Sequence, residues 1–149
     1  MNVGELCNRE VVFAEREMGL VEAARLMREH HVGSLVVVAG RLSDRIPVGM
    51  ITDRDIVVAA VAKEVDPKTL RVGDVMSAGA LVVREQDGIT DALRLMREKG
   101  VRRLPVVAAS GALVGIVAID DVLELVAEEM DGFVRTLRSE RQRESRIRP

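Results

Sequence analysis

The sequence predicts an α/β fold in which a unit of strand, helix, strand, strand and helix occurs twice. The main observation is an internal repeat, since residues 23–29 return almost unchanged as residues 92–98, at an offset of 92 − 23 = 69. Short apolar runs also alternate with segments whose apolar residues recur at helical spacing. We therefore expect two similar units, residues 1–66 and 67–132, followed by an extension, residues 133–149.

Each unit shows the same order of elements. Two near-continuous apolar runs, residues 35–38 and 104–107, are typical of strands that are buried on both faces. The other elements are strands at residues 11–13, 48–51, 81–83 and 113–117, first helices from Leu20 and Ile89, and second helices from near Asp53 and Asp120. Since Gly49 returns as Gly115 at an offset of 115 − 49 = 66, the first unit has a longer loop between residues 39 and 48.

The composition narrows the possible functions. The chain has 149 residues, enough for one domain with a core, and only 1% are aromatic, so the core must be aliphatic. Few aromatic rings and a net charge of −2 argue against binding of single-stranded nucleic acid, which usually stacks its bases on such rings. The single cysteine, Cys7, favours a reducing compartment. With no signal-like start and no membrane-length apolar run, we expect a cytoplasmic protein without a membrane partner.

Two stretches carry the candidate chemistry. Residues 49–56 (GMITDRDI) and their partial copy, residues 115–122 (GIVAIDDV), each predict a short apolar strand that runs into a helix. The backbone N–H groups at such a helix start attract oxygen ligands and anions. Two of these junctions in one small chain suggest a duplicated binding element.

A structural explanation of the same residues is a capping box formed by Thr52 and Asp55, with aspartate in place of glutamate. The copy keeps the acid as Asp121 but has Ala118 in the position of the threonine. Because alanine is a poor N-cap, an acid that is kept without its capping partner favours a ligand over a cap.

These stretches resemble the motif of CBS domains, which runs apolar-Gly-apolar-apolar-Thr/Ser-x-x-Asp into a helix. Residues 48–55 match it fully, and residues 114–121 match it except at the Thr/Ser position. Residues 101–107 (VRRLPVV) resemble the strand entry of that family, and residues 32–35 are a copy without arginine. The resemblance covers residues 3 to about 129, and the layout is similar to small stand-alone bacterial CBS-pair proteins, including the hypoxic response type.

The resemblance implies a tandem CBS pair, or Bateman module, with its two β-α-β-β-α units related by a pseudo-twofold axis and its sheets packed through the second helices. It implies a homodimer, a flat disc of four units, that acts on an unknown protein partner. We expect an energy- or stress-sensing regulatory module rather than an enzyme. An adenine nucleotide (AMP, ADP or ATP) or S-adenosylmethionine would bind between the units as a regulatory ligand, with no cofactor required.

The resemblance also implies the site residues. In the family the motif acid holds the ribose hydroxyls, the threonine contacts ribose or phosphate, basic residues contact phosphate, and apolar residues line the base. The candidates are Thr52, Arg54, Asp55, Met76, Leu81, Val101, Arg102 and Arg103 for one cleft, and Val12, Val32, Gly33, Asp120 and Asp121 for the other. The alternatives are a surface cation pair for the arginines and plain core for the apolar residues. No metal site is expected, because adjacent histidines at a helix end, His30 and His31, do not face one another.

The two clefts are expected to be unequal. The first motif has a hydroxyl at Thr52 where the second has the methyl group of Ala118, and the two arginines come only from the second unit. We expect one strong site per chain, built on the first motif with the arginines close by. The second site should be weak or empty.

Residues 133–149 differ in composition from the rest of the chain. They hold six arginines and two glutamates, a balance of 6 − 2 = +4. One interpretation is a solvated extension of the last helix. The others are a contact for nucleic acid, which the composition disfavours, a contact for an acidic partner, or the working part of a ligand-free dimeric scaffold.

Overall fold

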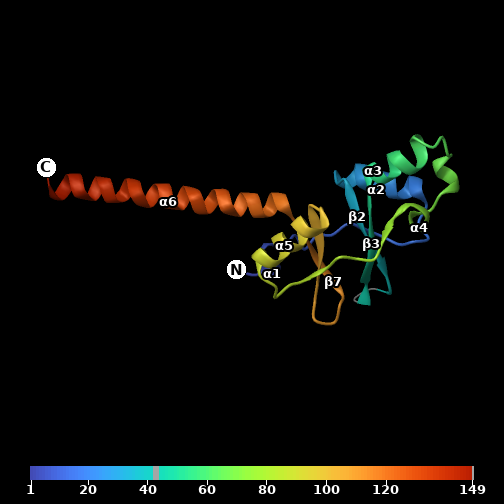
Figure 1. The fold of residues 1–149 in the computed structure, drawn as a ribbon, viewed down its shortest axis with the longest axis horizontal. Coiled ribbons are helices and arrows are strands. Elements are labelled where there is room, and N and C mark those ends of the chain that lie inside the picture. The colour runs from blue at the N-terminus through green and yellow to red at the C-terminus, as the bar shows by residue number, and fades with distance from the viewer. Residues whose placement is uncertain (42–43, 149) are drawn as a thin grey trace.

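The computed structural model describes residues 1–41 and 44–148. Figure 1 shows two sheets that lie next to each other, each with its own helices, and one long helix that leaves the body. In the first unit, the elements are β1 (Phe13–Ala14), α2 (Leu20–His30), β2 (Ser34–Ala39), β3 (Ile46–Thr52), α3 (Asp53–Ile56) and the π-helix η2 (Val57–Val61). In the second unit, they are β5 (Val83–Arg84), α5 (Ile89–Lys99), β6 (Arg103–Val107), β7 (Leu113–Ala118) and α6 (Ile119–Ile147).

The sheet topology confirms the repeated unit. In each unit the first strand pairs parallel with the second, and the second pairs antiparallel with the third. The registers correspond residue by residue, since Gly49 lies opposite Val37 and Gly115 lies opposite Val106. An irregularity follows directly in both units, after Val37 and after Val106. The predicted α/β class with two β-α-β-β-α units is therefore confirmed.

The units also exchange short elements. Helix α1 (Val3–Leu6) lies against the second unit, where the Gly4 N–H donates to the Glu85 carbonyl at 2.8 Å. Helix α4 (Val72–Val75) lies against the first unit, where the Val72 N–H donates to the Met18 carbonyl at 2.9 Å. Strand β4 (Ser77–Ala78) then pairs with β3. These crossings connect the two units through backbone hydrogen bonds on both sides.

Two aliphatic cores follow from this exchange. The first takes most of its residues from the first unit but includes Val72, with Val75 and Met76 packed against it. The second includes Val3 and Cys7 from the start of the chain. The middle strands β2 and β6 are the most buried elements, in agreement with their continuous apolar sequence. Each core is therefore completed by about one turn of helix from the other half of the chain.

The first helices of the two units end alike. Helix α2 is followed by the C-cap His31, which has φ 53°, and α5 by the C-cap Gly100, which has φ 64°. This left-handed conformation is common after a helix C-terminus and favours glycine. A short linker with one 3-10 turn, η3 (Pro67–Thr69), joins the units, with Asp66 as its N-cap.

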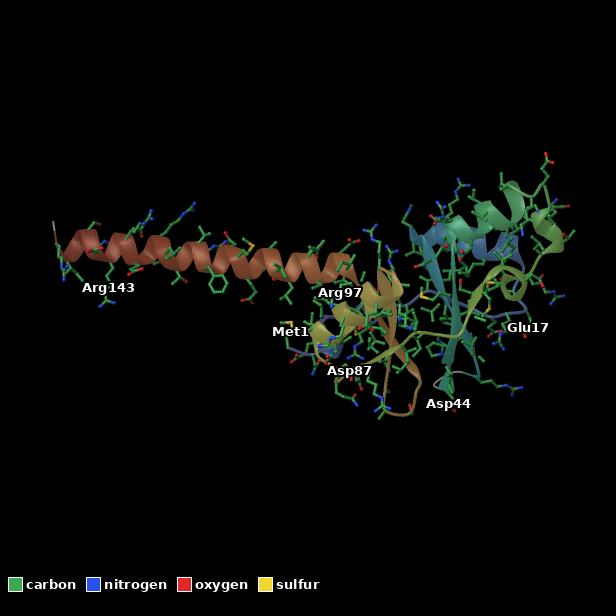
Figure 2. The ribbon with its side chains drawn as sticks, in the orientation of Figure 1. Met1, Glu17, Asp44, Asp87, Arg97 and Arg143 are labelled. Atoms are coloured by element: carbon green, nitrogen blue, oxygen red, sulfur yellow. The ribbon has the colours of Figure 1, made fainter. Side chains whose placement is uncertain are left out.

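Helix α6 includes both the second helix of its unit and the extension in one continuous helix. It runs for 29 residues without a break near residue 132. Figures 1 and 2 show it projecting from the body, and every residue from Val126 to Arg148 is exposed. The last helix thus continues into the Arg-rich segment as far as Ile147. No helix of the described residues is long and apolar enough to cross a membrane.

Candidate functional site at the starts of the second helices

The first motif forms a capping box at the start of α3. The Asp55 N–H donates to the Thr52 hydroxyl at 3.1 Å, and the Thr52 N–H donates to the Asp55 carboxylate at 2.9 Å. Both side chains are partly buried. A carboxylate accepts about four hydrogen bonds, so a second oxygen of Asp55 keeps capacity for a ligand hydroxyl while the first one caps the helix.

The second motif keeps half of this box. The Ala118 N–H donates to the Asp121 carboxylate at 2.8 Å, although alanine offers no acceptor in return. The acid therefore has a structural role that does not need the threonine. Contrary to the expectation from the sequence, the missing threonine is therefore no evidence for a ligand at Asp121, since the partner of the acid is the backbone N–H of residue 118.

The same acid-to-backbone bond recurs at helix starts outside the two motifs. The Arg71 N–H donates to Asp74 at 2.8 Å at the start of α4, and the Asn2 N–H donates to Glu5 at 2.7 Å at the start of α1. An acid three residues after the N-cap is thus a general device of this fold. This hydrogen bond alone is therefore no sign of a ligand at Asp55 or Asp121. A ligand role for these two acids depends on the positions of the helix starts at which they lie.

In each unit, the entry to the second strand lies against the start of the second helix. The Asp53 N–H donates to the Gly33 carbonyl at 3.0 Å, and the Ile119 N–H donates to the Arg102 carbonyl at 2.8 Å. A Cβ atom on Gly33 would lie 3.1 Å from an Asp53 carboxylate oxygen. Residue 33 therefore lies in close contact with the start of α3, and a side chain there would press on the Asp53 carboxylate.

Arg102 fills the equivalent position of the second unit. Its guanidinium lies 3.4 Å from Asp120, with both side chains more than half exposed. Arg102 thus contacts the second motif rather than the first, with which we expected it. Arg103, the next residue, begins β6 and is exposed.

The apolar candidates divide between the two cores. Val12, Val32 and Met76 pack against the first core, and Leu81 and Val101 pack against the second. All five are partly buried, so each keeps some exposed surface. Met76 lies against Gly49 of β3, where a Cβ atom would meet the Met76 methyl group at 2.5 Å. Met76 therefore packs against the first unit, although it belongs to the second unit by sequence.

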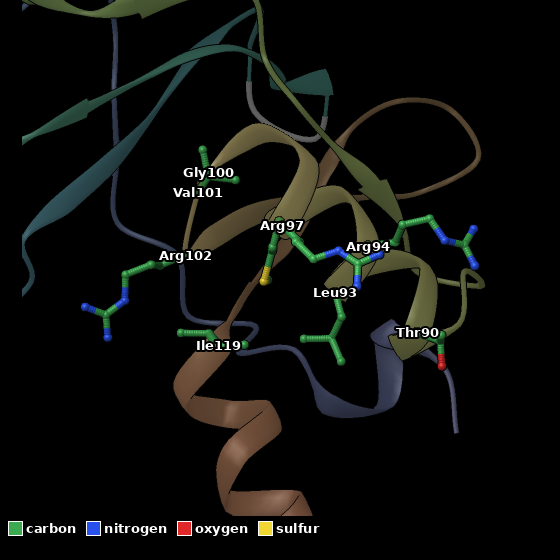
Figure 3. Close-up of a pocket in the computed structure, with 9 residues that line it drawn as sticks. Thr90, Leu93, Arg94, Arg97, Gly100, Val101, Arg102 and Ile119 are labelled. Atoms are coloured by element: carbon green, nitrogen blue, oxygen red, sulfur yellow. The ribbon is translucent and has the colours of Figure 1, made fainter.

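A groove of about 630 Å³ lies between α5 and the start of α6 (Figure 3). Of the predicted site residues it contains Val101 and Arg102. Its other lining residues are Thr90, Leu93, Arg94, Met96, Arg97, Gly100 and Ile119. Figure 3 shows Arg102 extending away from Leu93, so an apolar floor is bordered by arginines.

The groove arises because the second helices take different paths. In the first unit the chain packs back on α2, and Ala60 is only 2% exposed. The equivalent residue of the second unit, Val126 (60 + 66 = 126), is 48% exposed because α6 leaves the body. Sequence analysis missed this groove, since the repeat predicted equal packing in both units.

Cys7 and the histidine and acidic side chains are the remaining candidates for reactive or metal-binding groups. Burial raises the pKa of the Cys7 thiol, which belongs to the second core. In the part of the chain that the structure describes, no group of three or more His, Cys, Asp or Glu side chains is placed to hold a metal ion.

A family model for the CBS domain matches the chain twice, at residues 3–62 and 72–128. The chain belongs to the CBS domain family. The two matches correspond to the two units described above, so the chain is a tandem CBS pair, and the predicted resemblance is confirmed.

Several known proteins are similar to this CBS pair. An uncharacterized protein of Methanopyrus kandleri is 36% identical over 92% of this chain and 72% of its own length. Hypoxic response protein 1 of Mycobacterium tuberculosis is 37% identical over 86% of this chain and 82% of its own length. A crystal structure of Hypoxic Response Protein I with two coordinated zinc ions has a TM-score of 0.72 and 33% identity, over 83% of this chain and 98% of that one.

A further similarity concerns the fold alone. The CBS domain pair of protein MJ0100, crystallised with 5′-methylthioadenosine and S-adenosylmethionine, has a TM-score of 0.74 at 22% identity. The match covers 87% of this chain and 98% of that one. This fold therefore accommodates adenosine-containing ligands in at least one protein.

Proposed function

We propose that this CBS pair is a regulatory module that binds an adenine nucleotide at the starts of α3 and α6. The observation that carries the proposal is the pair of equivalent helix starts, each with an inward-turned acid and the entry of a neighbouring strand against it. A helix start presents backbone N–H groups to anions. Asp55 and Asp121 would accept hydrogen bonds from ribose hydroxyls, because bonds to a carboxylate are the stronger kind.

The two motifs offer different groups to the rest of the ligand. The first has the Thr52 hydroxyl, Gly33 in close contact with Asp53, and Arg54 on the first turn of α3. The second has Arg102 against Asp120, with Arg103 next in sequence. Guanidinium groups suit phosphate oxygens, so we assign Arg102 to phosphate binding at the second motif. Val12, Val32, Met76, Leu81 and Val101 keep partly exposed apolar surface that suits a base.

Regulation would follow from a difference in affinity between two conformations. A ligand shifts an equilibrium only as far as it binds one state better than the other. We propose that AMP, ADP, ATP or S-adenosylmethionine changes how the units sit against each other, and that this changes the surface shown to a protein partner in the cytoplasm. The exchanged elements α1 and α4 connect the units and would transmit the change.

A thermal-shift measurement tests the binding. A ligand at a hundred times its dissociation constant adds about 2.7 kcal/mol to the free energy of unfolding. For a chain of this size that corresponds to roughly 5–10 °C in melting temperature. We expect such a shift with at least one of AMP, ADP, ATP and S-adenosylmethionine at millimolar concentration. An unmoved melting curve with all four would leave the ligand-free scaffold as the better explanation.

We also propose that the module is a homodimer. Val57, Val58 and Val61 on η2 and Leu123 on α6 are exposed, which leaves aliphatic surface on the second helices of both units. Such a surface marks an interaction site. Light scattering at micromolar concentration should give about twice the chain mass of 16.3 kDa. Monomer mass throughout that range would exclude the disc of four units.

A second candidate function is the binding of nucleic acid through the arginines of α6. The observation that favours it is the exposure of residues 126–148, with six arginines among residues 135–148. Binding that depends steeply on salt concentration would support it. The low aromatic content of the chain and its net charge of −2 argue against nucleic-acid binding.

A further inference from the structure

One face of α6 carries an unpartnered apolar stripe. Its residues recur at alternating spacings of three and four, which is the pattern of a coiled-coil seam. They are Ile119, Leu123, Val126, Met130, Phe133 and Leu137, and the same spacing continues through Glu140 and Glu144 to Ile147. From Leu123 to Leu137 every member of the stripe is at least 48% exposed.

The body of the protein does not cover this stripe. Figure 2 shows α6 standing clear of the two units, and its residues from Met130 onward are all exposed. The helix is internally supported by weak i,i+4 ion pairs, from Arg135 to Asp131 and from Arg148 to Glu144. Most helices in proteins are stabilised by the packing of an apolar face, and not by such pairs. The stripe therefore requires a partner.

We propose that the partner is α6 of a second copy, paired antiparallel. The distribution of charges along α6 favours a second α6 as the partner, and it favours the antiparallel orientation. Residues 119–134 contain six acids and no base, and residues 135–148 contain six arginines and two glutamates. Antiparallel pairing places the acidic half of each helix along the basic half of the other. Parallel pairing places like charges side by side, which is unfavourable.

The helix length selects the register. In the seam register closest to full overlap of two 29-residue helices, Val126 faces Leu137 of the partner subunit and Met130 faces Phe133 of the partner subunit. These contacts occur twice by symmetry and give four consecutive apolar layers. In the flanking positions Asp120 then meets Arg141 of the partner subunit. A shift by one heptad towards the body would instead bring Glu129 against its own copy.

The groove beside α5 supports this register. Glu144 of one copy would lie opposite Ile119 of the other, at the mouth of the groove that Arg94, Arg97 and Arg102 border. Glu144, one of the two glutamates that interrupt the stripe, thus falls near these arginines. Ile147, which is exposed in the single chain, would reach the apolar floor formed by Leu93 and Val101.

Association of the full chain tests the pairing. The double variant Phe133→Glu/Leu137→Glu places two charges inside the stripe, and Ser139→Glu/Gln142→Glu places the same two charges on the same helix outside it. Sedimentation over a range of concentrations should show association at least tenfold weaker for the first variant than for the wild type, and unchanged for the second. Equal association of all three proteins would overturn the proposal, as would a wild type that stays monomeric.

The direction is tested by spin-label distances at two equivalent outer positions, Glu128→Cys and Gln142→Cys. In the antiparallel register, residue 142 lies opposite residue 121, and residue 128 lies opposite residue 135. At 1.5 Å per residue, the labels at 142 are offset along the axis by about 32 Å and those at 128 by about 10 Å. Parallel helices would give equal distances at both positions and would contradict the proposal. Wild-type protein carried through the labelling reaction controls for Cys7, which is buried.

The pairing and the proposed nucleotide site are tested separately. The stripe from Met130 to Leu137 contains none of the motif residues, and the end of the partner helix would lie near the second motif and away from the first. Phe133→Glu/Leu137→Glu should therefore bind nucleotide at the first motif with the affinity of the wild type. Normal nucleotide binding with unchanged association would reject only the pairing. Lost association in the variant, with no nucleotide binding by the wild type, would reject only the function.

Discussion

Replacement of Asp55 by alanine is expected to weaken the binding of adenine ribonucleotides by roughly 10- to 150-fold. The change removes a carboxylate that would accept ribose hydroxyls, and hydrogen bonds to charged groups are worth about 1.5–3 kcal/mol. The affinity for the 2′-deoxy ligand should fall much less, because that ligand never forms the second hydrogen bond. Titration calorimetry with both sugars measures the difference.

The matched control is Asp74→Ala. Asp74 accepts from the Arg71 N–H at the start of α4 in the same way that Asp55 accepts from Thr52, but it lies outside both motifs. The two variants should lose similar stability, by about 0.5–2 kcal/mol, the usual scale of a lost cap. Only Asp55→Ala should lose nucleotide affinity. Equal affinity losses for the two variants, or for the two sugars, would mean that Asp55 is only a capping residue.

Replacement of Gly49 by alanine is expected to destabilise the fold by about 1–3 kcal/mol, the range for overpacking a filled site. A Cβ atom there would contact the Ser77 carbonyl oxygen and lie 2.5 Å from the Met76 methyl group. Strand β4 would have to move away from β3, although the two are hydrogen-bonded. At roughly 2–4 °C for each kcal/mol, the melting temperature should fall by several degrees.

Gly132→Ala is the control for this change. Gly132 lies within α6, and an added Cβ atom there meets no atom within 4 Å. Alanine is the better helix former by about 1 kcal/mol, so the melting temperature should stay the same or rise. If Gly49→Ala were equally harmless, the contact between β3 and the strand from the other unit would contribute little to stability.

The fold could be predicted because the sequence contains an internal repeat, so that the same order of elements occurs twice. The repeat of residues 23–29 and the continuous apolar runs located the first helices and middle strands correctly. The exchanged elements were not predicted, because Val3 and Val72 look alike in sequence while each packs against the opposite unit. Which unit a short apolar turn joins depends on the path of the linkers, and local periodicity carries no information about it.

The candidate site was predictable in part. Thr52, Asp55 and Asp121 lie at helix starts, as the motif indicated. The position of Arg102 was not predictable, because its contact with Asp120 depends on how the entry to β6 lies against the start of α6. This contact also modifies the expected inequality of the clefts, since the first motif has the hydroxyl and the second has an arginine. We still propose that the sites differ, because these groups contact different parts of a nucleotide.

The central claim is that a nucleotide binds at the two helix starts, and calorimetric titration of the full chain tests it most directly. AMP, ADP, ATP and S-adenosylmethionine would be titrated into the wild type and into Asp55→Ala/Asp121→Ala, with Asp74→Ala as the folded control. The account predicts saturable binding of at least one of these ligands to the wild type and to the control, with about one molecule per chain in the tighter phase, and its loss in the double variant. Absence of saturable binding by all four, or wild-type affinity in the double variant, would contradict it.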